Sequence, residues 1–165
     1  MLRRGIPVAI LLGLFLGGLL IVPALAKDYT GTSGDDVIEG TASQDTFDMQ
    51  GGADTVWARG GPDILHMDQG ADRGHGEDGG DVIYGGDSPA FPNGFDALWG
   101  GIGNDTITDA SVNGDWDYGC GGQNDDGIYL NDGDTQDWAT GGTGSDSLSV
   151  DHGEHAYAGD ETCPP

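Results

Sequence analysis

The sequence contains very few basic residues. It has 165 residues, with only 5 lysines and arginines against 29 aspartates and glutamates, and a formal net charge of −24. A charge of this sign repels the phosphates of nucleic acids and the head groups of anionic membranes, so both are excluded as expected partners. The sequence has only four histidines and two cysteines, and neither recurs regularly, which argues against zinc or copper sites.

Large apolar side chains are also sparse after the first 26 residues, whereas glycine occurs 33 times. A chain this acidic usually stays disordered, because it buries too little apolar surface to offset the entropy of ordering. The glycines lack the three-residue spacing of collagen. Order in this chain must therefore come from another regularity, or from something that neutralises the carboxylates.

That regularity is an aspartate that returns every nine residues between Gly31 and Tyr84. The residue two positions after it is apolar in five of six cases, and the residue two positions before it is glycine or serine. A fixed period of this length predicts a solenoid. Including later units that follow shifts in phase, the aspartates at this position are Asp36, Asp45, Asp54, Asp63, Asp72, Asp81, Asp96, Asp105, Asp117, Asp126, Asp137 and Asp146.

We number each unit 1 to 9, with the aspartate at position 6. Positions 1 to 6 predict a glycine-rich turn and positions 7 to 9 a short strand, with position 8 pointing inward and positions 7 and 9 outward. Two units, 18 residues, are expected to form one coil with a strand on each side. The predicted fold is therefore all-β, with two facing parallel sheets and a thin core along position 8.

The period is interrupted in three places. Insertions near residues 88–93, 109–113 and 132–135 are expected to bulge out as loops and to weaken the sites at Asp96, Asp117 and Asp137. Lys27–Thr30 is expected to be a short lead-in to the repeats. Gly74 and Gly119 are expected to leave gaps at inward positions. The last unit, a degenerate cap with a tail, places His155 at the aspartate position and Tyr157 at the apolar one.

The stacked aspartates need a cation. Two carboxylates one coil apart, about 4.8 Å, repel by roughly 3.5 kcal/mol at an effective dielectric constant of 20. Repeated along both edges, this repulsion outweighs a thin core. Calcium fits best, because it accepts six to eight oxygen ligands from carboxylates and backbone carbonyls, whereas magnesium demands a tighter octahedron.

The residues at 100–108 and 141–149, Gly-Gly-Ile-Gly-Asn-Asp-Thr-Ile-Thr and Gly-Gly-Thr-Gly-Ser-Asp-Ser-Leu-Ser, resemble the nonapeptide of RTX (repeats-in-toxin) proteins, the hemolysin-type calcium-binding repeat. The resemblance covers nearly all of residues 27–165. It implies a parallel β-roll in which the position-6 aspartates and turn carbonyls bind several calcium ions between alternate turns. Unlike many RTX proteins, the chain has no evident catalytic or toxin domain beside the repeats.

The first 26 residues differ from the rest. Arg3 and Arg4 precede an apolar run, and Ala24-Leu25-Ala26 offers a small-residue cleavage site. We interpret residues 1–26 as a secretory signal peptide and residues 27–165 as the calcium-binding domain. The alternative is an uncleaved membrane anchor, since residues 6–26 are nearly long enough to span a bilayer. Cleavage would leave no membrane span and a secreted or cell-surface protein.

Two further features have open interpretations. In an exported chain, Cys120 and Cys163 are expected to form a disulfide that pins the tail to the roll, the alternative being free or intermolecular thiols. Outward position 9 carries Trp57 and Trp99 on one expected sheet and Tyr84 and Tyr129 on the other. These rings are either a sugar-binding surface or ordinary residues of an exposed sheet.

The sequence therefore predicts an exported calcium-binding protein that folds on binding and is a non-catalytic structural or interaction module. No nucleophile motif or phosphate-binding loop is present, and a repeated aspartate row is better explained by structural ligands than by catalysis. The alternatives are a module that binds extracellular polysaccharide or a cell surface, and an accessory module of a polysaccharide-active enzyme.

Overall fold

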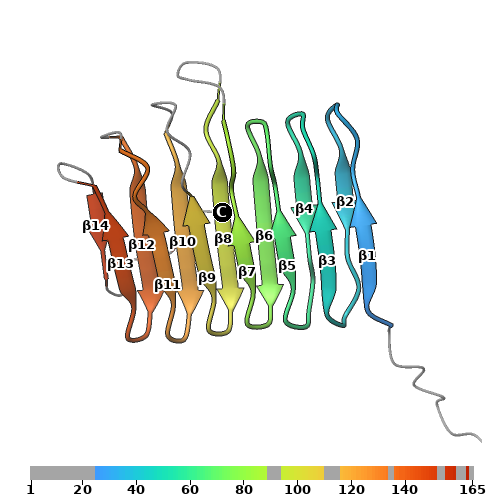
Figure 1. Cartoon of the computed structure of the whole chain (residues 1–165). Helices are drawn as coiled ribbons and strands as arrows, with labels where there is room; N and C mark the ends of the chain where they lie inside the picture. The colour runs from blue at the N-terminus through green and yellow to red at the C-terminus, as the bar shows by residue number, and fades with distance from the viewer. Residues whose placement is uncertain are drawn as a thin grey trace, which may run out of the picture.

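The fold is a solenoid built entirely from short strands, as a computed structural model shows (Figure 1). The structure describes residues 25–88, 94–109, 116–133, 136–151, 155–158 and 163. The predicted signal peptide up to residue 24 and most of the three insertions lie outside these residues. None of the described segments is a helix with the length and hydropathy needed to cross a bilayer.

The strands alternate between two parallel sheets along the chain. The odd sheet has the order β1 (Lys27–Thr30), β3 (Asp45–Asp48), β5 (Ile64–His66), β7 (Val82–Tyr84), β9 (Thr106–Asp109), β11 (Gly127–Leu130) and β13 (Ser147–Val150). The even sheet has the order β2 (Val37–Glu39), β4 (Thr55–Trp57), β6 (Arg73–Asp78), β8 (Ala97–Ile102), β10 (Tyr118–Gln123), β12 (Trp138–Thr143) and β14 (His155–Tyr157). The predicted coil of two units and two facing parallel sheets is confirmed.

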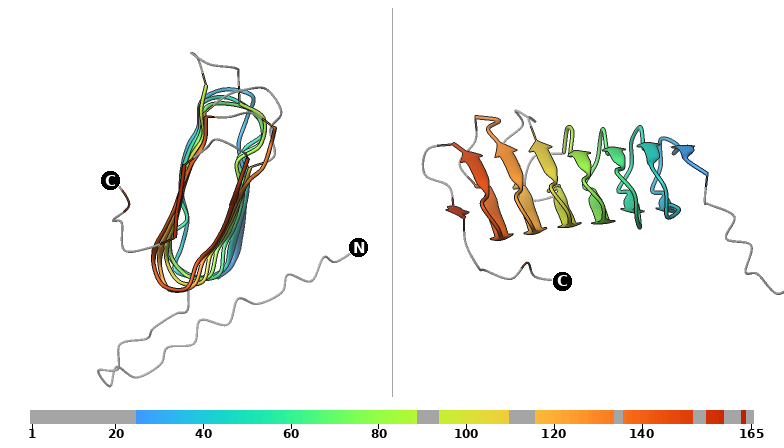
Figure 2. Two further views of the ribbon diagram at one scale, coloured as in Figure 1. Left: turned by 90° about the vertical axis from the view of Figure 1, so that its left-hand side faces the viewer. Right: turned by 90° about the horizontal axis from the view of Figure 1, so that it is seen from below.

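Viewed along its axis, the molecule is a narrow flattened tube in which successive coils nearly superimpose (Figure 2). The strand register explains this shape, since each strand pairs residue by residue with the strand one coil away, as Phe47 does with Leu65 and Leu65 with Ile83. Position 8 is buried throughout the middle coils, and position 9 is mostly exposed. The alternation predicted from the sequence is therefore correct.

The core is wider than the predicted single row. Besides the position-8 side chains, fully buried Met49, Ala58, Met67 and Leu130 stand at position 1 and add a second inward row at the junction of strand and turn. The predicted gaps at Gly74 and Gly119 are wrong. A Cβ at Gly74 would lie 3.3 Å from both Ile83 Cγ2 and Leu98 Cδ2, because neighbouring side chains close over the glycine.

Both ends of the roll differ from the sequence prediction. The predicted lead-in is strand β1, and its register with β3 pairs Lys27 with Asp45, so a lysine occupies the first aspartate position. At the other end, His155 pairs with Trp138 and Ala156 with Ala139. His155 therefore stands at position 7 and Tyr157 at position 9, each one position later than predicted. The last unit has no aspartate at position 6, so its phase within the nine-residue period could not be fixed from the sequence.

The turns form two edges of different character. We call the turns from even to odd strands, residues 40–45, 58–63, 76–81, 100–105, 121–126 and 141–146, the regular edge. All three predicted insertions fall in turns that follow odd strands, and we call this side the insertion edge. It is the upper side of Figure 1.

Candidate metal centre

The structure gathers all twelve predicted aspartates into two ladders, one along each edge. Within a ladder, the backbone N–H of each aspartate donates to Oδ1 of the aspartate one coil further on. The N···O distance is 2.7 Å from Asp54 to Asp72 and 2.8 Å from Asp63 to Asp81. The regular edge holds Asp45, Asp63, Asp81, Asp105, Asp126 and Asp146, and the insertion edge holds Asp36, Asp54, Asp72, Asp96, Asp117 and Asp137.

The second carboxylate oxygen of these aspartates faces the inside of the turn. In the described part of the chain, Oδ2 of Asp63, Asp81 and Asp105 is buried and accepts no hydrogen bond. Oδ2 is also buried and accepts no hydrogen bond in Asp54, Asp72, Asp126 and Asp146. A buried carboxylate oxygen without a donor is costly, because burial removes the water that solvates its charge.

Backbone carbonyls converge on the same place. A Cβ built on Gly100 would collide with Asp105 Oδ2 and would lie 2.6 Å from the carbonyl oxygen of Gly121 in the next coil. Gly76 and Gly121 show the same arrangement with the aspartates of their own turns. We call this space beside a position-1 glycine the oxygen cradle. Carboxylate and carbonyl oxygens without nitrogen or sulfur are the ligands that calcium prefers, so the residues present fit a calcium ion.

Burial also changes the acidity of the ladder. Removal from water raises the pKa of Asp63 and Asp105 to about 7 and that of Asp72 to about 8. The neighbouring N–H bond lowers the pKa, and the aspartates of adjacent coils raise it further. A bound cation would reverse this trend by stabilising the charged form of each carboxyl.

These shifts predict opposite pH responses with and without calcium. The pKa of Asp63, Asp72 and Asp105 is 3.8 when unfolded and about 7 to 8 when folded, so the metal-free fold is favoured at low pH and loses stability as pH rises from about 4 to 8. In chelator, strand content measured by circular dichroism is expected to increase when pH falls from 8 to 5. In calcium, the same acidification is expected to weaken ion binding, because protons compete for Oδ2. Equal responses in the two conditions would contradict this coupling.

The insertion edge carries two additional carboxylates that the sequence reasoning missed. Ligand oxygens of Asp96, Asp109 and Asp117 all lie within 4.8 Å of one another, as do those of Asp117, Asp132 and Asp137. All these residues are buried. Asp109 stands at position 1 of the repeat, where a glycine was expected. This aspartate in place of glycine was the feature of the sequence that could have indicated an additional ligand. The sites next to the insertions therefore have more carboxylates, although they were expected to be the weaker ones.

The family comparison matches the model of the RTX calcium-binding nonapeptide repeat, in four copies, at residues 30–65, 68–88 and 93–108. The matched segments are RTX calcium-binding nonapeptide repeats. Neither a curated protein nor a solved structure matches the chain significantly. The same two-sheet architecture continues beyond residue 108, since β10 to β13 keep the same parallel register and the ladder runs on to Asp137 and Asp146.

A disulfide lies on the even sheet, beyond the matched repeats. Cys120 on β10 is fully buried and bonded to Cys163, with Cα atoms 5.9 Å apart. Cys120 occupies position 9, in register with Trp99 and Thr140. The bond therefore holds Cys163 against the outer face of the even sheet.

Loss of this disulfide is expected to destabilise the C-terminal coils. Its cysteines are 43 residues apart, and opening a loop of this length costs about 4 kcal/mol in the chain-entropy model. The Cys120→Ala, Cys163→Ala double variant in calcium is expected to melt at lower temperature, with hydrogen exchange increasing first in β12 to β14. Wild-type protein treated with a reductant is the control and should behave alike; unchanged exchange in β12 to β14 would contradict the prediction.

Proposed function

We propose that this chain is an exported calcium-binding protein that folds on binding and is a structural or interaction module without catalytic activity. The observation that carries the proposal is the line of buried Oδ2 atoms without donors, which at Asp81, Asp105 and Asp126 lie beside a backbone carbonyl oxygen of the next coil. Calcium, when bound, supplies positive charge to this line. The chain's own residues position the oxygens: glycines make room for them, and the Oδ1 ladder fixes each carboxylate in one orientation.

Two observations support the non-catalytic and exported parts of the proposal. The carboxylates repeat in every coil, as expected for structural ligands, whereas a catalytic pair is confined to one location. A buried disulfide is typical of proteins in oxidising compartments, and the basic and apolar start of the sequence is typical of a secretion signal.

The direct test is the metal content of residues 27–165. After exhaustive chelation, the protein is dialysed against calcium or magnesium, and the bound ions are counted by elemental analysis and isothermal titration calorimetry. We expect several calcium ions per chain and little magnesium at the same concentration. Absence of calcium binding in a folded protein would overturn the proposal.

A second candidate function is binding of a neutral saccharide, but most position-9 rings do not favour it. Trp57, His75 and Trp99 stack on one another along the even sheet, with interplanar angles of 7° and 4°. One face of Trp57 and one face of Trp99 are therefore covered by His75 and are not free to stack on a sugar. The predicted pairing of Trp57 and Trp99 as a sugar platform thus has little structural support.

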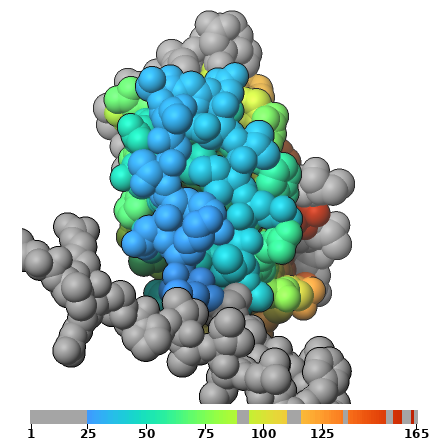
Figure 3. All heavy atoms as spheres, turned by 90° about the vertical axis from the view of Figure 1, so that its right-hand side faces the viewer, coloured from blue at the N-terminus to red at the C-terminus, as the bar shows by residue number. Residues whose placement is uncertain are grey.

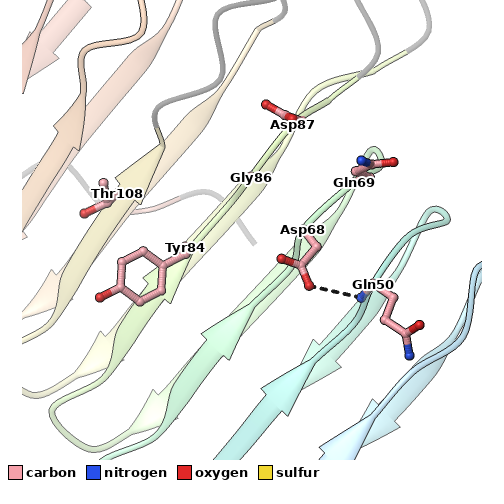
Figure 4. A pocket seen from close by; sticks show the side chains of 7 residues that line it. All are labelled: Gln50, Asp68, Gln69, Tyr84, Gly86, Asp87 and Thr108. Atoms are coloured by element: carbon pink, nitrogen blue, oxygen red, sulfur yellow. Dashed lines mark hydrogen bonds between the residues drawn. The ribbon is translucent and has the colours of Figure 1, made fainter.

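Tyr84 on the odd sheet is different. His66 stacks on one face of its ring with centroids 4.8 Å apart, while its partner in the next strand is Thr108, which has no ring. A polar groove of about 460 Å³ opens beside it (Figure 4). The groove is lined by Gln50, Asp68, Gln69, Tyr84, Gly86, Asp87 and Thr108. An aromatic face beside amides and carboxylates suits a neutral sugar, and the carboxylates disfavour polyuronates.

Replacement of Tyr84 is expected to weaken saccharide binding selectively. The probes are cellohexaose and laminarihexaose, with polygalacturonate as the charged comparison, measured by calorimetry in calcium. Tyr84→Ala is expected to reduce affinity for the neutral probe at least tenfold. Tyr129→Ala is the matched control: Tyr129 has similar exposure, 40% against 42%, but its ring lies back over Gly127. Equal losses in both variants, or no binding by the wild type, would remove this candidate.

A further inference from the structure

The second residue of the turn has two backbone conformations in this protein. In eight turns it has a positive φ, between 66° and 114°. These residues are Gln50, Arg59, Asp68, Glu77, Gly86, Gly101, Gly122 and Gly142. Among the turns that begin with a glycine at position 1, the first two are different, because Thr32 and Thr41 do not have a positive φ. Threonine is β-branched, and a β-branched residue rarely adopts this region.

The conformation decides where the position-2 N–H points. In the first two turns the N–H of Thr32 donates to Asp36 Oδ2, and that of Thr41 donates to Asp45 Oδ2, each at 2.6 Å. The Thr32 hydroxyl lies 2.9 Å from Asp36 Oδ2 and provides a second donor. In later turns, such as those of Asp63, Asp81 and Asp105, Oδ2 accepts no hydrogen bond within the described residues.

The first coil also supplies its carboxylates with donors from the chain itself. Asp45 Oδ1 accepts a hydrogen bond from the Lys27 backbone N–H at 2.8 Å, so both of its carboxylate oxygens have donors. Lys27 occupies the aspartate position of strand β1, and its ammonium group lies 4.0 Å from the centre of the Tyr29 ring. This coil, seen end-on in Figure 3, therefore has a lysine at one aspartate position and hydrogen-bond donors to Oδ2 of both Asp36 and Asp45.

We propose that Thr32 and Thr41 replace calcium in the first coil, which is a metal-independent cap, and that the calcium row begins beyond it. This inference rests on the proposed function and assigns which of its turns bind the ion. Among the turns that have glycine at position 1, and therefore an open oxygen cradle, position 2 is the selecting residue. A β-branched threonine closes the turn with its own N–H, whereas a residue with positive φ turns the N–H away and leaves Oδ2 for a cation.

The experiment counts calcium ions on residues 27–165 by native mass spectrometry, with circular dichroism in calcium to verify folding. Thr32→Gly recreates at residues 31–36 the glycine spacing of residues 100–105, and we expect it to bind one additional ion. Thr32→Val keeps the β-branch and the N–H, so its ion number should equal that of the wild type. Thr30→Gly, an exposed site on β1, is the matched control and should also leave the number unchanged.

Two further variants test the reverse direction. Asp36→Asn is expected to retain every ion, whereas Asp81→Asn, beside the cradle at Gly76, should lose one. Loss of an ion in Asp36→Asn, or no gain in a folded Thr32→Gly protein, would overturn the inference. A wild-type protein that binds no calcium would instead overturn the proposed function, so the two failures are distinguishable.

Discussion

Removal of calcium is expected to convert the roll into a largely unfolded chain. Without a cation, buried carboxylates repeat along both edges, and each pair one coil apart repels by roughly 3.5 kcal/mol at an effective dielectric constant of 20. The core has at most two apolar side chains per unit, too few to offset this term and the entropy of ordering. Far-UV circular dichroism of residues 27–165 should lose its strand signal in chelator at pH 8 and regain it on calcium addition.

Magnesium at the same concentration is the control for general charge screening, and it should restore little strand because it retains its waters and demands octahedral geometry. High sodium chloride is a second control. The transition should be cooperative, since each coil is stabilised by its neighbours. A strand spectrum that persists in chelator at pH 8 would contradict coupled folding. Full recovery in sodium chloride would reduce the role of calcium to screening.

Filling one oxygen cradle is expected to remove one calcium site. Gly100→Ala places a methyl group where Asp105 Oδ2 and the Gly121 carbonyl oxygen converge. The fold itself tolerates a side chain at this position, as Ala58, Met49 and Met67 show. The expected result is therefore a folded protein with one bound ion fewer. At free calcium 100 times the dissociation constant, loss of one site costs about 2.7 kcal/mol of stability.

The matched control for this variant is Gly34→Ala. Gly34 is also a turn glycine, but a Cβ built on it would meet no atom within 4 Å, and its φ is not positive. Calorimetric titration and thermal melting in calcium should show no change for Gly34→Ala and a reduced ion number and melting temperature for Gly100→Ala. Equal effects of the two variants would mean that the cradle is not the binding site.

Much of this architecture could be predicted from the sequence because a single number, the nine-residue period, determines it. The alternation of successive units between two sheets correctly placed Trp57 and Tyr84 on different sheets. The period also identified every aspartate of both ladders. These features depend only on spacing, and spacing is visible without coordinates.

The remaining features depend on departures from the period. Asp132 joins a carboxylate cluster beside an insertion, where no repeat position identifies it, whereas Asp109 could have been found only from its place at position 1 instead of glycine. Met49 and Met67 stand where glycine was expected, so their burial shows only once the junction of strand and turn is built. The orientation of the Thr32 N–H depends on a backbone angle, which sequence spacing does not determine.

The location of all three insertions on one edge has a consequence for how such a molecule can change over time. The Oδ1 ladder closes across each insertion, with N···O distances of 2.8 Å from Asp72 to Asp96 and from Asp96 to Asp117, so added residues leave the strand register intact. The opposite edge keeps turns of uniform length. One side of the protein can therefore accept new loops of varied length and sequence while the other maintains the structure. The roll can therefore act as a scaffold that presents variable loops on one edge, whether these loops arise by natural divergence or are grafted as binding loops.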